Sequence, residues 1–213
     1  MLEGFTRISQ ASCRQRILCQ RLSDFRAVHT QIFATVSAEA GRIRDEECIV
    51  QIFGSVCDNW DLDGEFALLN KQLSAMIAEA RTAQDKIVIL AFTHARIVAM
   101  QPALFGNKRT AMCLALSQAR ALLREITTLH PFDTQAYYLG LEAFIKAGDS
   151  ELLNRVFGQI FGISGPFSPA PFVARCGCYQ ADRWQMDPQG VLDSSRKRIS
   201  AIVSKQRRSA LLA

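Results

Sequence analysis

Oxygen-bearing side chains alternate in one short polar stretch of the chain, where Asn59, Asp61 and Asp63 are followed by Gly64. This spacing is typical of a calcium-binding loop, because alternating carboxylates can all point inward at one hard cation. The closing position of such a loop needs a bidentate Glu, and in this chain it is Asn70. The same acids can cap the helix that follows. Helix capping is therefore the favoured interpretation, and calcium binding is the alternative.

Two of the seven cysteines could contribute to a zinc site. Cys176 and Cys178 would supply two thiolates, and His130 or Cys57 would complete the set of ligands. A spacing of one residue is not that of common zinc sites, so a pair of thiols without metal is the favoured interpretation. The odd count, with most cysteines in apolar helical patterns, indicates reduced thiols and a cytoplasmic protein.

The three histidines give no catalytic pattern. We expect His29 on a helix surface, His94 in the core and His130 at a corner between helices. The chain has no Ser/His/Asp order, no phosphate-binding glycine loop and no paired-histidine motif. The sequence therefore predicts no catalytic residue, no cofactor and no metal, and it favours a protein that is not an enzyme. An enzyme with unmarked chemistry is the alternative, to be recognised by a deep polar pocket.

The net charge of +5 comes from the C-terminal tail, since the last 18 residues contain six basic residues and no acid. Such a tail can neutralise the phosphates of nucleic acid, meet an acidic partner or lipid headgroups, or remain solvated. It has no aromatic residue for stacking on bases. The basic residues are Arg196, Lys197, Arg198, Lys205, Arg207 and Arg208.

Apolar residues recur at steps of three and four along most of the chain, which predicts an all-α protein. We expect a multi-helix bundle, or a short helical-repeat-like array, of about seven to eight helices. Residues 86–92 could instead form a buried strand, but the apolar pattern continues to Met100, so a helix is favoured. The expected helices span residues 12–40, 45–56, 66–80, 85–101, 111–129, 134–147, 150–162 and 192–210.

The chain divides by composition into three parts. Residues 1–163 form the expected helical domain, residues 164–190 a Pro-containing linker or wrap, and residues 191–213 a basic C-terminal helix. The longest apolar run, Ile87 to Phe92, is far too short to cross a bilayer. No membrane span is therefore expected.

Residues 110–162 contain a pattern of small, aromatic and turn residues around Pro131. Ala119 precedes it, and Tyr137, Leu139-Gly140 and Gly148-Asp149 follow it. This pattern resembles a junction of the tetratricopeptide repeat family, in which small residues let neighbouring helices approach closely. The chain departs from the family at Ala143, where an aromatic residue is expected, and has no second copy 34 residues away. An ordinary helical hairpin within a unique bundle is the alternative.

The resemblance implies a protein that binds other proteins. We expect a non-enzymatic adaptor or chaperone-like subunit, bacterial in style, with a secretion-system accessory as the specific version. Its expected groove residues are Tyr137, Tyr138, Leu141 and Phe144, because aromatic anchors carry much of the energy of protein interfaces. The alternative is a nucleic-acid-binding regulator that uses the basic tail. The oligomeric state and the partner do not follow from the sequence.

Overall fold

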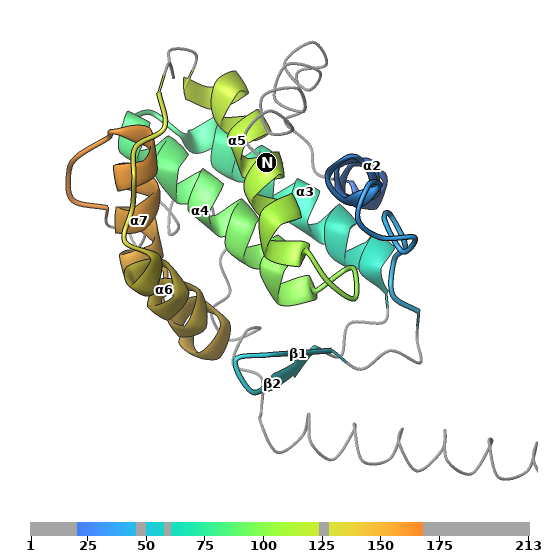
Figure 1. The fold of residues 1–213 in the computed structure, drawn as a ribbon. Coiled ribbons are helices and arrows are strands. Elements are labelled where there is room, and N and C mark those ends of the chain that lie inside the picture. The colour runs from blue at the N-terminus through green and yellow to red at the C-terminus, as the bar shows by residue number, and fades with distance from the viewer. Residues whose placement is uncertain (1–20, 46–49, 58–60, 124–127, 168–213) are drawn as a thin grey trace, which may run out of the picture.

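The computed structural model describes residues 21–45, 50–57, 61–123 and 128–167. Within these residues the chain forms six helices and one two-stranded hairpin, so the predicted all-α class is confirmed (Figure 1). The helices are α2 (Leu22–Phe33), α3 (Leu62–Glu79), α4 (Ala83–Met100), α5 (Asn107–Leu123), α6 (Thr134–Ala147) and α7 (Glu151–Phe161), and the strands are β1 (Val50–Ile52) and β2 (Ser55–Cys57).

Helix α4 is the centre of the fold. It packs against α3, α5, α6 and α7, while α2 lies on the side away from the α6–α7 pair (Figure 1). Thr82 and Asp85 form a capping box at its start, and every residue from Ile87 to Met100 is buried. A helix that is apolar nearly all round has to be covered on every side. The prediction of a helix here, instead of a strand, is confirmed.

A buried polar network fixes the turn between α4 and α5. Gln101 adopts a left-handed conformation with φ of 46°, and Arg44 donates to its carbonyl oxygen at 2.7 Å. The side chain of Asn107 donates to Gln101 Oε1 at 2.9 Å and to the carbonyl of Ala103 at 2.7 Å. Asn107 Oδ1 in turn accepts from the Ala103 N–H. These bonds hold the first turn of α5, and with it Lys108, in one position.

Helices α6 and α7 form a close antiparallel hairpin. A Cβ atom on Gly140 would lie 2.8 Å from the backbone nitrogen of Leu153, so only glycine allows this approach. Gly148 ends α6 in the left-handed conformation at φ of 69°, as glycines commonly do at helix ends. The expected close approach at Gly140 is observed. The tetratricopeptide resemblance itself stays a prediction.

The helix predicted for residues 45–56 is wrong, because residues 50–57 form a β-hairpin. Phe53 and Gly54 both have positive φ, of 50° and 78°, which is the backbone of a tight two-residue hairpin turn. The β-branched Val50 and Ile52 favour the extended backbone on one side of that turn. The spacing of apolar residues is compatible with a helix, but the positive φ of Phe53 and Gly54 reverses the chain and pairs the two flanking segments as strands.

The first predicted helix, residues 12–40, is also too long at its C-terminal end. Helix α2 ends at Phe33, and the chain folds back so that Gly41, with φ of 80°, packs against Thr30. The Gly41 N–H donates to Nδ1 of His29 at 2.8 Å, and Nε2 of His29 lies 2.9 Å from the Phe105 carbonyl oxygen. His29 is therefore fully buried, and its predicted place on a helix surface is wrong.

Of the eight predicted helices, six correspond to observed ones. The predicted helix 192–210 lies outside the described residues, as do residues 168–190 of the predicted linker. Residues 128–133 are not helical, so the helix predicted for 111–129 ends before its expected stop. At the start of the linker, the Ser164 carbonyl accepts from Gln84 at 2.9 Å and Phe167 is buried. This short piece packs back onto the helices.

Candidate protein-binding surface

Large apolar side chains are exposed at six positions in the described part of the chain, and four of them fall within eleven residues. Val36 and Leu104 are the two that lie elsewhere. Water-exposed apolar groups that gather in one region mark an interaction site more often than scattered ones do. We call the four clustered residues the α6 apolar surface: Leu129 (50% exposed), Phe132 (38%), Tyr138 (41%) and Leu139 (50%).

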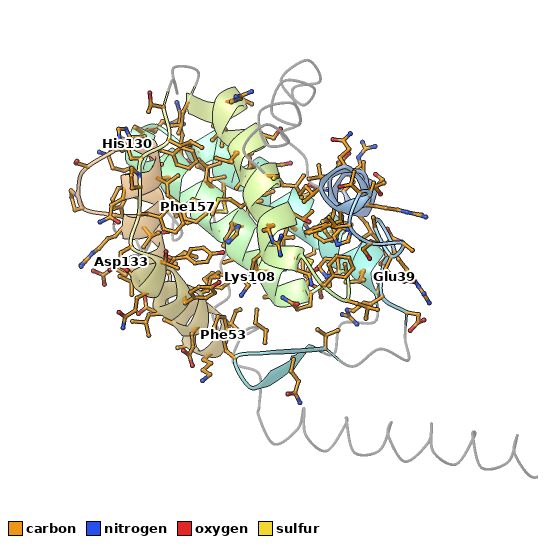
Figure 2. The ribbon with its side chains drawn as sticks, in the orientation of Figure 1. Glu39, Phe53, Lys108, His130, Asp133 and Phe157 are labelled. Atoms are coloured by element: carbon orange, nitrogen blue, oxygen red, sulfur yellow. The ribbon has the colours of Figure 1, made fainter. Side chains whose placement is uncertain are left out.

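The segment before α6 is held in place by backbone and ring contacts. The His130 N–H donates to the Ile160 carbonyl near the end of α7 at 2.9 Å, which keeps this exposed corner residue against the hairpin. The predicted corner position of His130 agrees with this placement (Figure 2). Phe132 precedes the N-cap of α6 and its ring meets that of Tyr137 at 5.7 Å, the arrangement of a hydrophobic staple. Phe132 is therefore fixed although it is partly exposed.

Asp133 caps α6 and sets the direction in which the helix leaves this segment. Its Oδ1 accepts from the backbone N–H groups of Gln135 at 2.8 Å and Ala136 at 3.1 Å (Figure 2). We expect Asp133→Ala to lower the free energy of unfolding in urea by about 1 kcal/mol, because two N–H groups lose their acceptor. Asp133→Asn keeps an acceptor and is the matched control. Equal losses for Ala and Asn would contradict the capping role.

The exposed face of α6 presents Tyr138 and Leu139 beside a lysine from another helix. Nζ of Lys108, in the first turn of α5, lies 4.5 Å from the centre of the Tyr138 ring. This is a cation–π contact, which holds the ammonium group of the half-buried Lys108 over the ring of the exposed Tyr138. Figure 2 shows Lys108 between α5 and α6. The surface therefore combines apolar side chains with one positive charge.

Three of the four predicted groove residues are not accessible in this structure. Tyr137, Leu141 and Phe144 are buried, and Phe144 packs edge-on against Phe92 of α4 with ring centres 6.2 Å apart. They lie three and four residues apart, so they share one helix face, and that face meets the core. The expectation that these three form an open groove is wrong. Tyr138 alone remains on the surface.

Sequence reasoning missed Leu129, Phe132, Leu139 and Lys108. A signal for one of them was present, because Leu139 falls out of phase with the buried positions 137, 141 and 144 and so points to solvent. Lys108 gave no such signal, since its contact with Tyr138 joins residues 30 positions apart in two different helices.

Tyr137 connects the surface to the only histidine of α4. Its hydroxyl lies 2.8 Å from Nε2 of His94, and the His94 ring also packs against Phe157 at 5.3 Å. Burial lowers the pKa of His94 to about 4, although a hydrogen bond with the Ala111 backbone opposes this change. Burial also raises the pKa of Tyr137, with a further contribution from Tyr138. Both side chains are thus neutral at pH 7. The predicted core position of His94 is confirmed.

The residues of the other predicted sites are placed as follows. Asp61 caps α3 through the Gly64 N–H at 2.8 Å, and α3 begins at Leu62, so Asp63 and Asn70 lie within a helix and not in a calcium loop. The favoured capping interpretation is thus supported for Asp61.

Burial raises the pKa of the Cys113 thiol to about 12, which keeps it protonated. Nowhere in the described ranges do three or more His, Cys, Asp or Glu side chains gather as metal ligands could.

Several predicted residues lie outside the described part of the chain. They include Asn59, Cys176, Cys178 and the six basic tail residues, Arg196, Lys197, Arg198, Lys205, Arg207 and Arg208. The interpretation of Cys176 and Cys178 as thiols without metal therefore stays the favoured prediction, with zinc binding as its alternative. Nucleic-acid binding through the tail likewise stays the alternative function.

The described helices include none with the length and apolar character needed to cross a membrane. Comparison of the chain with protein-family models, with curated proteins and with solved structures gave no match.

Proposed function

We propose that this chain is a helical protein-binding module, an adaptor or chaperone-like subunit that holds a partner protein on the α6 apolar surface. One observation carries the proposal: four of the six exposed large apolar side chains in the described residues lie within eleven consecutive residues, from Leu129 to Leu139, and the rings of Phe132 and Tyr138 both meet that of Tyr137. Leaving them in water costs free energy that a partner would recover by covering them.

The construction of the surface supports this role. Phe132 is held by Tyr137, and Tyr138 by Lys108, so both aromatic side chains are ordered before any partner arrives. Ordered side chains lose little conformational entropy on binding, which favours affinity. Tyrosine is also among the residues that most often anchor protein interfaces. The tetratricopeptide-like hairpin expected from the sequence fits the same role, and a place in a secretion system remains its specific version.

The test is site-specific photo-crosslinking in the cells that make the protein. A photoreactive aromatic residue replaces Leu139 in one variant and Val36, which is 73% exposed beyond α2, in the control. We expect discrete crosslinked partners at position 139, with a yield about five times that at position 36. This ratio corresponds to a preference of about 1 kcal/mol for partner contact at position 139 over position 36. Equal yields at the two positions would overturn the proposal.

A second arm of the same experiment tests the aromatic anchor. Tyr138→Ser, combined with the photoreactive residue at position 139, should reduce the crosslinked product about tenfold, the effect of losing one interface anchor of about 1.4 kcal/mol. Tyr138 is exposed, so the unfolding temperature should change little. Persistence of the crosslinks in a folded Tyr138→Ser protein would show that the partner binds elsewhere.

A further inference from the structure

Lys108 occupies an electrostatically unfavourable place. It lies in the first turn of α5 beside Arg109, and that turn contains no acidic residue. The N-terminus of a helix carries a partial positive charge, so it favours acids and disfavours lysine. The other basic residue of the turn has a different neighbour, because Arg109 lies over the ring of Phe33 at 5.1 Å. Lys108 is thus the charge of this turn that faces α6.

Among the residues that the structure describes, the ammonium group of Lys108 has an aromatic neighbour but no ion-pair partner. In the described ranges, ion pairs within 4.0 Å involve Arg42, Arg96, Lys146 and Arg155, and none involves Lys108. On α6 the nearest acid in sequence to Tyr138 along the exposed face is Glu142, which pairs with Lys146. The α6 apolar surface therefore adjoins one positive charge, that of the half-buried Lys108, which no described carboxylate neutralises.

Charge complementarity then defines the occupant of the surface. We propose that the α6 apolar surface binds an acidic amphipathic segment of a partner protein, whose apolar side chains cover Tyr138 and Leu139 and whose carboxylate pairs with Lys108. The inference rests on the protein-binding function proposed above and states the chemistry of the partner. A carboxylate here would form a charge-assisted hydrogen bond with the ammonium group of Lys108.

The same argument disfavours the basic tail of this chain as the occupant. Residues 196–213 contain six Lys/Arg residues and no acid, so their charge repels Lys108. A second copy of the chain is likewise disfavoured on this face, because a two-fold contact would bring two Lys108 side chains and no described carboxylate partner into the same interface.

The probes are three fluorescein-labelled helical peptides of about 15 residues, or about four turns. They share one apolar stripe and differ at a central flanking position, which is Glu, Gln or Lys. Fluorescence anisotropy with the full-length chain at about 50 mM salt, where screening is weak, should show tightest binding for the Glu peptide. We expect the Kd of the Gln peptide to be about five times that of the Glu peptide. The Lys peptide should bind more weakly than either.

Two variants separate this inference from the proposed function. Lys108→Met keeps the length of the side chain and should bring the Glu and Gln peptides within about twofold of each other, while apolar binding persists. Lys71→Met, an exposed lysine of α3, is the matched control and should keep the fivefold preference. Tyr138→Ser should weaken binding of all three peptides, which tests the surface itself.

The outcomes are distinct. A preference for the Glu peptide that survives Lys108→Met overturns the inference but leaves the proposed function standing. Binding of all peptides that is unaffected by Tyr138→Ser overturns both. If no peptide binds and sedimentation shows a dimer that Tyr138→Ser dissociates, the surface is occupied by a second copy, which also overturns the inference.

Discussion

Replacing Gly140 with Ala is expected to lower the free energy of unfolding by about 3 kcal/mol, the upper range for forced overpacking of a core. Helix propensity alone predicts the opposite, because Ala is about 1 kcal/mol more favourable than Gly within a helix. The added Cβ would meet the backbone nitrogen of Leu153 at 2.8 Å and its Cα at 3.0 Å. Backbone atoms cannot rotate away as a side chain can, so α6 and α7 must separate.

The control for this variant is Ala147→Gly, at an exposed position of the same helix. This substitution changes helix propensity without changing the α6–α7 contact, so it should lower the free energy of unfolding by no more than about 1 kcal/mol. Both variants are compared with the parent chain by urea unfolding followed by circular dichroism. A gain in stability for Gly140→Ala would show that the two helices are not in close contact at this position.

Most helices of the fold could be predicted from local sequence pattern. Helices α3, α4, α6 and α7 carry apolar residues in helical period, and the turn at Gly148-Asp149 separates the last two. Helix α4 is apolar nearly all round, which favours a central position, and it is buried there. In these elements the local pattern and the tertiary packing agree.

The elements that were mispredicted depend on contacts or turns that periodicity does not encode. The strands at 50–57 follow from a turn in which Phe53, a residue other than glycine, takes positive φ. The burial of His29 requires Gly41 and Phe105, which are 12 and 76 residues away in the chain. Such long-range partners are not visible in a helical stripe.

The candidate surface shows the same limit at the level of single residues. Tyr137 and Tyr138 are adjacent in sequence, yet one is buried and the other is 41% exposed, because successive side chains on a helix differ in direction by about 100°. The period that links Tyr137, Leu141 and Phe144 marks the side of α6 that meets α4, and not an open binding face. Aromatic content points to α6 as the candidate helix, and helical phase separates its exposed side from its buried side.

Acidification is expected to destabilise this protein through His94. The His94 pKa is about 4 in the folded chain, against an ordinary value of 6.5 that applies when the chain is unfolded. Between these values the unfolded state binds a proton that the folded state does not, so stability falls as the pH falls. The contribution of neutral His94 to the free energy of unfolding is complete above pH 6.5 and is lost progressively as the pH falls toward 4. From pH 7 to pH 5 the loss due to His94 is about 2 kcal/mol.

Two variants isolate this contribution from that of other titrating groups. His94→Gln cannot be protonated, so the loss of stability between pH 7 and pH 5 should shrink by about 2 kcal/mol relative to the parent chain. Tyr137→Phe removes the hydroxyl 2.8 Å from Nε2 but leaves the imidazole buried, so the pH dependence should persist. Urea unfolding at both pH values measures the losses, and NMR of the His94 ring protons measures the pKa directly. A His94 ring that titrates near its ordinary value would contradict this explanation, because a buried neutral imidazole has to resist protonation until the fold itself is weakened.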